Sequence, residues 1–233
     1  NKLAGFDYWL GVYDFNEIED AIIKLEPDLV VNDILNTEAS YICRLKDAGI
    51  AVLNFEDLGS GASVADVTIN DLYDNCQIAG DNIRWGHTWY ILRDEFEAAK
   101  PRSYSERVKN LLLTFGGTDP SNHTLRVLSL VIQYCQEHGI EIDIVVGEAY
   151  GAIAELRDKM RSLKANSIRL TYGTDVLSHI MERVDVAICS NGRTIYELAH
   201  MNIPAVVIAH HEREDGHKFA SEETGFLRMK LGD

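Results

Sequence analysis

The chain has 233 residues, 46% of them hydrophobic, which suffices for one large α/β domain or two small ones with packed cores. Its 22 Lys and Arg residues face 37 Asp and Glu residues, and this formal net charge of -15, with no dense basic cluster to offset it, argues against nucleic acid and anionic membranes as partners. A bound phosphate would have to be held by backbone amides and few cations.

The cysteines Cys43, Cys76, Cys135 and Cys189 lie far apart and lack the spacing of a zinc site. This pattern predicts reduced thiols, no bound metal and a cytoplasmic protein. Cys135 on an apolar helical face and Cys189 at the end of an apolar strand are expected to be buried. No run approaches the roughly 18 apolar residues of a membrane span, and nothing resembles a secretory signal. Because the chain opens at Asn1 inside an amphipathic stretch, we expect it to be part of a longer protein.

The first half of the chain predicts a βαβ pattern that forms a parallel sheet. The expected elements are, in chain order, a strand at residues 28–33, a helix at 37–48 stopped by Gly49, a strand at 50–55, a loop at 59–61 and a strand at 65–70. A polar stretch at 98–107 then marks a domain border. We therefore expect an amino-terminal domain with its linker at 1–103 and a carboxyl-terminal domain at 104–233.

After this border the βα alternation starts again. The expected elements are a strand at 108–115, a helix at 122–137 ended by Gly139, a strand at 141–146, a helix at 153–163, a strand at 167–171, a short helix capped by Asp175 and ending at Arg183, a strand at 184–189, a helix, and a strand at 203–208. The predicted fold class is α/β, with two Rossmann-like domains that each contain a parallel sheet.

Two glycine-containing turns in the second half follow buried strands and open helices. Glycine lets a ligand approach the backbone, and amides at a helix start attract anions, so a nucleotide phosphate is the expected ligand. The simpler alternative for the first turn is a tight connection in which Asp119 or Ser121 caps the helix. The candidate binding residues are Gly116, Gly117 and Thr118 in the first turn and Asn191, Gly192, Arg193 and Thr194 in the second.

The side chains around the second turn favour a nucleotide. Arg193 offers a planar cation to a phosphate, and Thr194 offers a hydroxyl. Glu197 lies one helical turn beyond Arg193 on the same face and can accept hydrogen bonds from both ribose hydroxyls. As an alternative, Glu197 complements the dipole of its helix.

Histidines and carboxylates cluster at residues 210–217. This cluster is either a solvated loop that leads into a helix at 216–220 or a proton-transfer site. A metal site is disfavoured because the spacing does not project the ligands together. His211 and Arg213 follow a strand end, so they are the candidates that we expect to face an interdomain cleft.

Other candidates lie in the first half and near the predicted hinge. Tyr90 and Arg93 are expected to contact substrate, and Arg93 can meet a phosphate or a carboxylate. Asn32 and Asp33 end a strand on the ligand side of the sheet, which makes Asp33, with His211, a candidate catalytic residue. Weaker candidates are Asp57, Asp71 and His87, the last of which is more simply explained as a packed side chain.

These residues resemble known families. Residues 185–208 look like the nucleotide-sugar site of glycosyltransferases with two facing Rossmann domains, the GT-B class. Residues 28–33, 90–96 and 114–120 resemble the UDP-2,4-diacetamido-2,4,6-trideoxy-β-L-altropyranose hydrolase family of pseudaminic acid biosynthesis, with its spore coat polysaccharide relatives. The resemblance runs across most of the chain.

The resemblance implies an enzyme that releases UDP from an activated amino sugar by attack of water, without a metal or cofactor. It also implies that the carboxyl-terminal domain holds the UDP, around Gly117, Thr118, Asn191, Gly192, Arg193, Thr194 and Glu197. The family's Gly-His loop, which carries its presumed general base, has no counterpart near Asn1, so the amino-terminal domain is expected to be incomplete. Its Asp-Asn-Gln segment is replaced here by residues 210–220. A GT-B glycosyltransferase, and a non-catalytic nucleotide-sugar binding domain fused to or associated with a cytidylyltransferase, remain alternatives.

Overall fold

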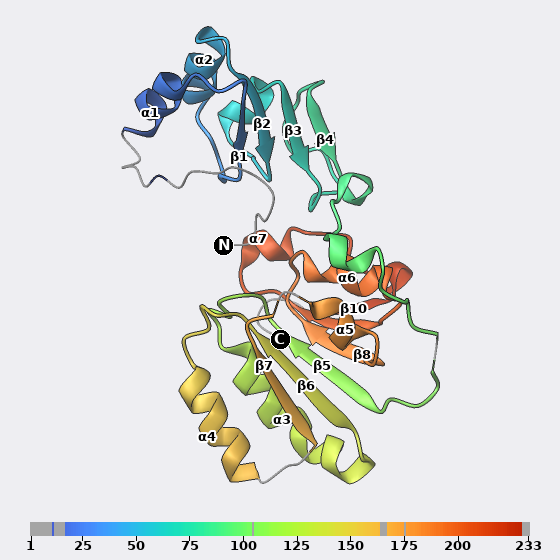
Figure 1. Ribbon diagram of the computed structural model, residues 1–233. Helices are drawn as coiled ribbons and strands as arrows, with labels where there is room; N and C mark the ends of the chain where they lie inside the picture. The colour runs from blue at the N-terminus through green and yellow to red at the C-terminus, as the bar shows by residue number, and fades with distance from the viewer. Residues whose placement is uncertain (1–10, 12–16, 104, 164–166, 175, 230–233) are drawn as a thin grey trace. The chain divides into compact units, whose positions relative to one another are not determined.

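The computed structural model describes residue 11 and residues 17–103, 105–163, 167–174 and 176–229, so the predicted cap Asp175 and the stretch that opens at Asn1 lie outside these ranges. The chain divides into two compact units (Figure 1). Unit 1 comprises Asn1–Asp71 and Asn75–Trp85, and unit 2 comprises Leu72–Asp74 and Gly86–Asp233.

This division differs from the border expected near residues 98–107, because residues 86–103 pack onto unit 2. Phe96 is fully buried there and its carbonyl oxygen lies 3.2 Å from Nε2 of His200. Arg102 donates its backbone amide to the carbonyl of Met201 at 2.9 Å. The polar composition of this stretch therefore belongs to a strap along one unit rather than to a linker.

Unit 1 is a parallel sheet of four strands in the order β1-β2-β3-β4. Its elements are α1 (Ile18–Leu25), β1 (Leu29–Asn32), α2 (Ala39–Asp47), β2 (Ala51–Phe55), β3 (Val67–Asn70) and β4 (Ile83–Trp85). Ile42 and Leu45 of α2 pack on Val52 of β2, where the alternation of buried and partly exposed residues follows the period of two of a strand. The expected strands and helix are confirmed, but β4 is only three residues long and had no signal in the sequence.

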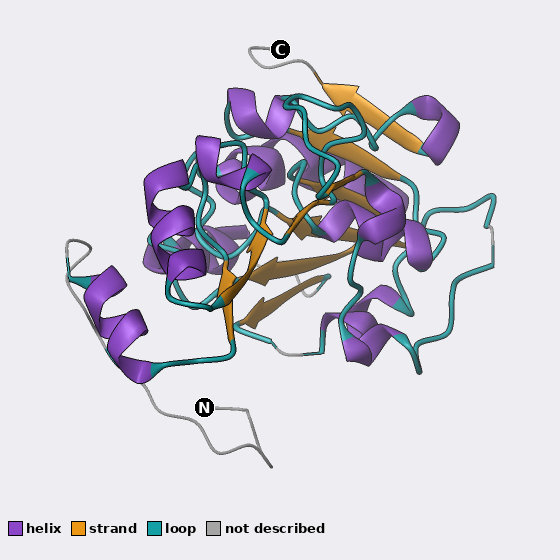
Figure 2. Cartoon of the chain, turned by 90° about the horizontal axis from the view of Figure 1, so that it is seen from above, coloured by secondary structure: helices purple, strands orange, loops and turns teal. Residues whose placement is uncertain are grey.

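Unit 2 is a parallel sheet of six strands in the order β10-β9-β8-β5-β6-β7. Its elements are β5 (Asn110–Thr114), α3 (His123–His138), β6 (Glu141–Val146), α4 (Ile153–Leu163), β7 (Ile168–Tyr172), α5 (Leu177–Met181), β8 (Val186–Cys189), α6 (Thr194–His200), β9 (Ala205–Ile208), α7 (Glu212–Asp215) and β10 (Phe226–Met229). The last strand, which leads to the end marked C in Figure 2, lies at the edge of this sheet. The predicted α/β class with two parallel sheets is thus confirmed.

The sequence of α3 shows why this unit packs as it does. Leu125, Leu128, Ile132 and Cys135 recur at steps of three and four residues, which places them on one buried face against β5 and β6. Gly139 ends the helix with φ 67°, in the left-handed region that glycine adopts without strain. Like Cys135, Cys189 is buried as expected, and burial raises the pKa of both thiols.

Two local expectations for the end of the chain are wrong. The helix expected at 216–220 occurs earlier, as α7, because the His211 ring accepts a hydrogen bond from the backbone amide of Glu214 and caps it. Gly216 then ends this helix. The strand β10 was not expected, because its four residues are too few to show the period of a strand.

The strand order of unit 2 creates one special place. From β5 the chain moves outward through β6 and β7, and then returns to place β8 on the other side of β5. In this register Thr114, at the end of β5, lies opposite Cys189, at the end of β8. Open α/β sheets bind ligands outside the carboxyl ends of the strands at such a reversal.

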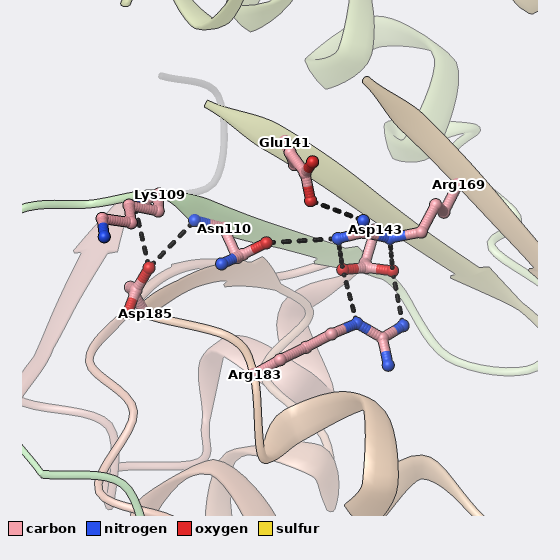
Figure 3. Close-up of polar contacts among 7 residues, drawn as sticks. All are labelled: Lys109, Asn110, Glu141, Asp143, Arg169, Arg183 and Asp185. Carbon is pink, nitrogen blue, oxygen red and sulfur yellow. Dashed lines mark hydrogen bonds and ion pairs between the residues drawn. The ribbon is translucent and has the colours of Figure 1, made fainter. Parts of the chain in front are cut away.

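The opposite, amino-terminal edge of this sheet carries a cluster of ion pairs and hydrogen bonds (Figure 3). Asp143 is 1% exposed and accepts hydrogen bonds from Arg169 at 2.9 Å and from Arg183 at 2.7 Å. Although burial opposes it, the two guanidinium groups hold the pKa of Asp143 below its ordinary value. Beside them, Asp185 accepts from the backbone amides of Lys109 and Asn110. These groups satisfy one another within the unit.

Across the ranges described, no helix combines the length and apolarity needed to cross a bilayer.

Candidate functional site

A pocket of about 490 Å³ opens at the carboxyl edge of the sheet in unit 2. Its lining comes from the ends of β5 and β6 and the turns that follow them, from the segment after β7 with the start of α5, from α6 with the residue before it, and from the strap at residues 90–93. The lining residues are Tyr90, Ile91, Arg93, Thr114, Gly116, Gly117, Val145, Val146, Gly147, Thr174, Leu177, Arg193, Thr194 and Glu197. The two predicted glycine turns therefore meet at the point where the strand order reverses, and the predicted Tyr90, Arg93 and Glu197 line the same pocket.

The turn after β5 leaves its backbone open to the pocket. Gly116 has φ 80°, a conformation that a side chain would strain. A Cβ built on Gly117 would meet no atom of the described chain within 4 Å. By contrast, a Cβ on Gly147 would lie 2.5 Å from the Gly117 backbone. Glycine at 147 thus lets two turns touch, while glycine at 117 lets a ligand come close.

The helix that follows this turn does not offer its first amides to a ligand. Asp119 is buried and accepts hydrogen bonds from the backbone amides of His123 and Thr124, both at 2.8 Å. The expectation that amides at the start of this helix face an anion is therefore wrong, and the alternative of a cap by Asp119 is confirmed. Thr118 is exposed and lies outside the pocket lining.

The turn after β8 contributes fewer contacts than expected. Asn191 is buried and its Nδ2 donates to the carbonyls of Glu214 at 2.6 Å and His217 at 3.0 Å. His217 Nδ1 in turn lies 2.7 Å from the carbonyl of Asn191. The Asn191 side chain thus holds residues 214–217 in place, and neither Asn191 nor Gly192 lines the pocket.

Arg193 sits in the pocket wall on an aromatic base. The Tyr90 ring stacks on Tyr196 with centroids 4.3 Å apart, and the Arg193 guanidinium lies 5.7 Å from the Tyr90 centroid. The Tyr90 hydroxyl donates to the Arg193 carbonyl at 3.2 Å. A cation over an aromatic face keeps its charge, so Arg193 brings a positive charge to the pocket wall.

The predicted ribose-binding residue Glu197 is bonded to the predicted substrate-binding residue Arg93. Nε of Arg93 donates to Oε1 of Glu197 at 2.8 Å, and Nη1 of Arg93 lies 2.8 Å from Oε1 of Glu95. The Glu197 side chain is only 6% exposed. Burial raises the pKa of Glu197, and the hydrogen bond from Arg93 opposes this rise.

The candidates at 210–217 lie elsewhere in unit 2. His211 is exposed and caps α7, and the Arg213 guanidinium lies 5.8 Å from the centroid of the Tyr73 ring. Neither lines the pocket. Within the residues that the structure describes, no group of His, Cys, Asp and Glu is arranged to hold a metal ion.

A pair of stacked histidines lies behind the first turn. The rings of His123 and His210 are 4.7 Å apart, and Nε2 of His210 lies 3.0 Å from the carbonyl of Phe115, to which it must donate. Burial, followed by the neighbouring His210, lowers the pKa of His123. The two residues are far apart in sequence, so no local pattern could predict that they form a pair.

The candidates of unit 1 belong to a buried polar network at the ends of its strands. Asn32 donates from Nδ2 to Oδ1 of Asn54 at 2.9 Å. Asp57 accepts from Nδ2 of Asn54 at 2.7 Å and from the backbone amide of Thr37 at 2.9 Å. Asp33 directly follows β1 and is exposed. Asn32 and Asp57 therefore hold the fold, while the exposed Asp33 lies outside this buried network.

The other two weaker candidates, Asp71 and His87, behave differently. Asp71 is fully buried. His87 is exposed on unit 2, where its Nδ1 lies 2.8 Å from Oδ1 of Asp74 and its ring packs 5.1 Å from Phe219. This agrees with the simpler expectation of a packed histidine.

Sequence reasoning missed part of the pocket wall. Gly147 follows β6, and Thr174 and Leu177 follow β7. The rule that selected the other two turns, a glycine directly after a buried strand, also applies to Gly147 and to Gly173. Glu95, which binds Arg93, had no such signal.

Comparisons with known proteins agree with this architecture. No family model matches the chain. The chain is 28% identical over 219 residues to an uncharacterized protein of Methanocaldococcus jannaschii, covering 85% of this chain and 44% of that protein. It is 26% identical over 216 residues to the spore coat polysaccharide biosynthesis protein SpsG of Bacillus subtilis, covering 88% of this chain and 63% of SpsG. The chain thus spans less than two thirds of the length of both relatives.

Solved structures share the fold at low sequence identity. MurG of Acinetobacter baumannii superposes with a TM-score of 0.55 at 16% identity, covering 91% of this chain and 62% of that chain. Anabaena HepE in complex with UDP superposes with a TM-score of 0.55 at 12% identity, covering 93% of this chain and 69% of HepE. The MnaA–UDP structure of S. aureus superposes with a TM-score of 0.57 at 13% identity, covering 86% of this chain and 62% of MnaA. The chain is therefore a homologue of a spore coat polysaccharide biosynthesis protein, with the two Rossmann-like units of the GT-B fold.

Proposed function

We propose that unit 2 binds the nucleotide part of a nucleotide-sugar. The observation that carries this proposal is the pocket at the strand reversal, which gathers the glycine turn after β5, the cation Arg193 and the buried carboxylate of Glu197. In this proposal the diphosphate lies along Gly116 and Gly117 and meets Arg193 and Thr194. The ribose hydroxyls donate to Glu197. The base lies toward the ends of β6 and β7, where the lining is mostly apolar.

The reaction that we propose is hydrolysis of the bond between the sugar and the diphosphate. The oxygen of water forms a bond to the anomeric carbon, the bond to the diphosphate oxygen breaks, and the nucleotide leaves with the electron pair. The proton of the attacking water passes to a general base, for which Asp33 and His211 are the candidates. Arg193 offsets the negative charge that grows on the leaving diphosphate.

Two observations support this reaction class. Residues 90–96 and 114–120, whose resemblance suggested a UDP-sugar hydrolase of nonulosonate biosynthesis, supply Arg93 and the glycine turn of the pocket. The homologue SpsG is named for polysaccharide biosynthesis, which consumes activated sugars. The proposed role is release of UDP, or another nucleotide, from an activated amino sugar used in a surface polysaccharide.

Two alternatives keep the same pocket. MurG and related folds favour a glycosyltransferase, in which an acceptor hydroxyl replaces water. The M. jannaschii relative is covered over only 44% of its length, which favours a nucleotide-sugar binding domain within a larger fused protein, such as one with a cytidylyltransferase.

Calorimetry with UDP and CMP tests the binding site. The protein is expected to bind one of them, and R193M and E197Q to weaken binding by about tenfold or more, as expected for loss of a hydrogen bond to a charged group. R157M, which removes an exposed arginine of α4 outside the pocket, is the matched control. Equal affinities for all four proteins would refute the site.

A second measurement separates the reactions. Release of UDP from candidate UDP-amino sugars without an acceptor supports the hydrolase. Turnover that requires an added acceptor supports the transferase, and nucleotide binding without turnover of any substrate supports the binding domain.

A further inference from the structure

We propose that Arg93 is a positioning residue, which orients the carboxylate of Glu197 so that it can accept hydrogen bonds from the ribose hydroxyls of the bound nucleotide. This inference rests on the proposed function, since it concerns the same pocket. It departs from the sequence-based expectation for Arg93, which assigned this residue directly to substrate.

The guanidinium of Arg93 is held by its neighbours in the protein, which suits a positioning role better than direct binding of a ligand. One face of the guanidinium lies 5.4 Å from the centroid of the Phe96 ring. Nε donates to Glu197 at 2.8 Å, and Nη1 is 2.8 Å from Glu95. Three neighbours thus determine where this guanidinium can lie.

The second carboxylate, Glu95, anchors this guanidinium to the rest of the pocket. Its Oε2 accepts a hydrogen bond from the backbone amide of Ser178 at 2.8 Å, in the first turn of α5. The Glu95 side chain is 11% exposed, so its ion pair with Arg93 is largely shielded from solvent on the Glu95 side. The chain of contacts from α5 through Glu95 and Arg93 to α6 therefore fixes the wall of the pocket on which Glu197 stands.

Glu197 needs such a partner because it is buried. Burial raises its pKa and Glu95 adds to that effect, while Arg93 and, from the turn before α6, Arg193 lower it. Arg93 bonds only Oε1, and among the described residues no hydrogen bond reaches Oε2. A carboxylate with one oxygen fixed and the other turned to a ligand suits recognition of a pair of hydroxyls.

Arginine is required for this arrangement. Its planar group donates a hydrogen bond to Glu197 from one nitrogen and forms an ion pair with Glu95 through another, whereas a lysine carries the charge on a single atom. R93K should therefore keep part of the effect of charge and lose part of the orientation.

The test compares two ligands, UDP and 2′,3′-dideoxy-UDP, which lacks both ribose hydroxyls. The ratio of their dissociation constants isolates the hydroxyl contacts, because titration of the diphosphate affects both ligands equally. In the unmodified protein UDP should bind about tenfold or more tightly than the dideoxy ligand. In R93M this preference should disappear, with dideoxy-UDP affinity within about twofold of the unmodified protein. R93K should show an intermediate ratio.

Dependence on pH adds a readout that a merely structural role would not move. Because Arg93 opposes the rise in the pKa of Glu197 that burial causes, removing it should raise that pKa further. The ratio should therefore fall more steeply in R93M than in the unmodified protein as the pH is lowered, with R93K between the two. E197Q and the double variant R93M/E197Q should give the same ratio, since both lack the charged carboxylate.

The outcomes are distinct. If the unmodified protein binds neither ligand, the proposed function and this inference both fail. If it prefers UDP and R93M shows the same preference at every pH, only the positioning role fails. If R93M weakens both ligands equally while R157M does not, Arg93 contacts the diphosphate directly and the inference is overturned.

Discussion

The two edges of the sheet in unit 2 use the same kinds of charged residue in opposite ways. At the amino edge, both oxygens of Asp143 accept hydrogen bonds from Arg169 and Arg183, so the carboxylate is paired entirely within the protein (Figure 3). At the carboxyl edge, Arg93 bonds one oxygen of Glu197, and Arg193 lies over an aromatic ring beside open glycine turns.

This difference separates residues that stabilise the fold from residues that are available to a ligand. A buried ion pair with every oxygen bonded leaves nothing for a ligand to add. A buried carboxylate bonded on one side, next to backbone that no side chain covers, still has capacity to bind. Changes at the first edge should therefore alter stability alone, and changes at the second should alter binding.

The largest expected effect is on stability, from D143N. The change removes the charge that both arginines share, so the free energy of unfolding should fall by about 2–4 kcal/mol, somewhat below the full range for buried pairs because both arginines are partly exposed. Urea denaturation measures this loss. The matched control D158N breaks an exposed pair with Arg161 on α4 and should cost less than about 1 kcal/mol. A weakened affinity for UDP in folded D143N would break the separation of the two edges.

A pair of glycine variants tests the carboxyl edge itself. In G147A the new Cβ would lie 2.5 Å from the Gly117 backbone, so unfolding free energy should fall by about 1–3 kcal/mol as the turns move apart. In G117A the Cβ meets no described atom within 4 Å, and stability should change by less than about 0.5 kcal/mol. UDP affinity should nevertheless fall about tenfold in G117A, because the methyl group occupies the approach of the ligand. Unchanged affinity in G117A would remove the first turn from the site.

The smallest expected effect is the pH dependence of stability. Burial lowers the pKa of His123 and of His217 below the ordinary 6.5, so the unfolded chain binds protons more readily than the folded one. Stability should therefore decrease as the pH falls below about 6.5, by an amount on the order of 1 kcal/mol. The variant H123Q should flatten this slope in thermal unfolding measured from pH 7 to pH 5.

The amino edge should respond in another pH range. The pKa of Asp143 is lowered, so its contribution is fully present above the ordinary 3.8 and is lost only as the pH falls through its value in the folded protein. D143N should accordingly leave the slope between pH 7 and pH 5 unchanged. A flattened slope in D143N would show that the two edges do not titrate separately.

The sequence predicted the elements and the turns better than the contacts between them. Gly116 and Arg193 were identified because glycines and cations after buried strands have a physical meaning in a parallel sheet. That their turns meet depends on β8 returning beside β5, which no local pattern specifies. The role of Asn191 was misjudged for the same reason, since its partners Glu214 and His217 come from a later segment.

The partners of a charged residue inside an apolar strand could not be predicted from the sequence either. Asp143 lies in the apolar strand β6, where a sequence pattern shows only an interruption. Its partners are supplied by β7 and by the segment before β8, so the cluster becomes visible only when those strand ends are aligned. The strands β4 and β10, of three and four residues, were likewise too short to show a period.

The strap at residues 86–103 has a practical consequence for dissecting the protein. A shortened protein that began at the predicted border, residue 104, would lack Tyr90, Arg93 and Phe96, and with them one wall of the pocket. It would also uncover the aromatic face of Tyr196 and the buried carboxylate of Glu197. A piece intended to bind nucleotide should instead start no later than Leu72, so that Tyr73 and Asp74 keep their contacts with Arg213 and His87.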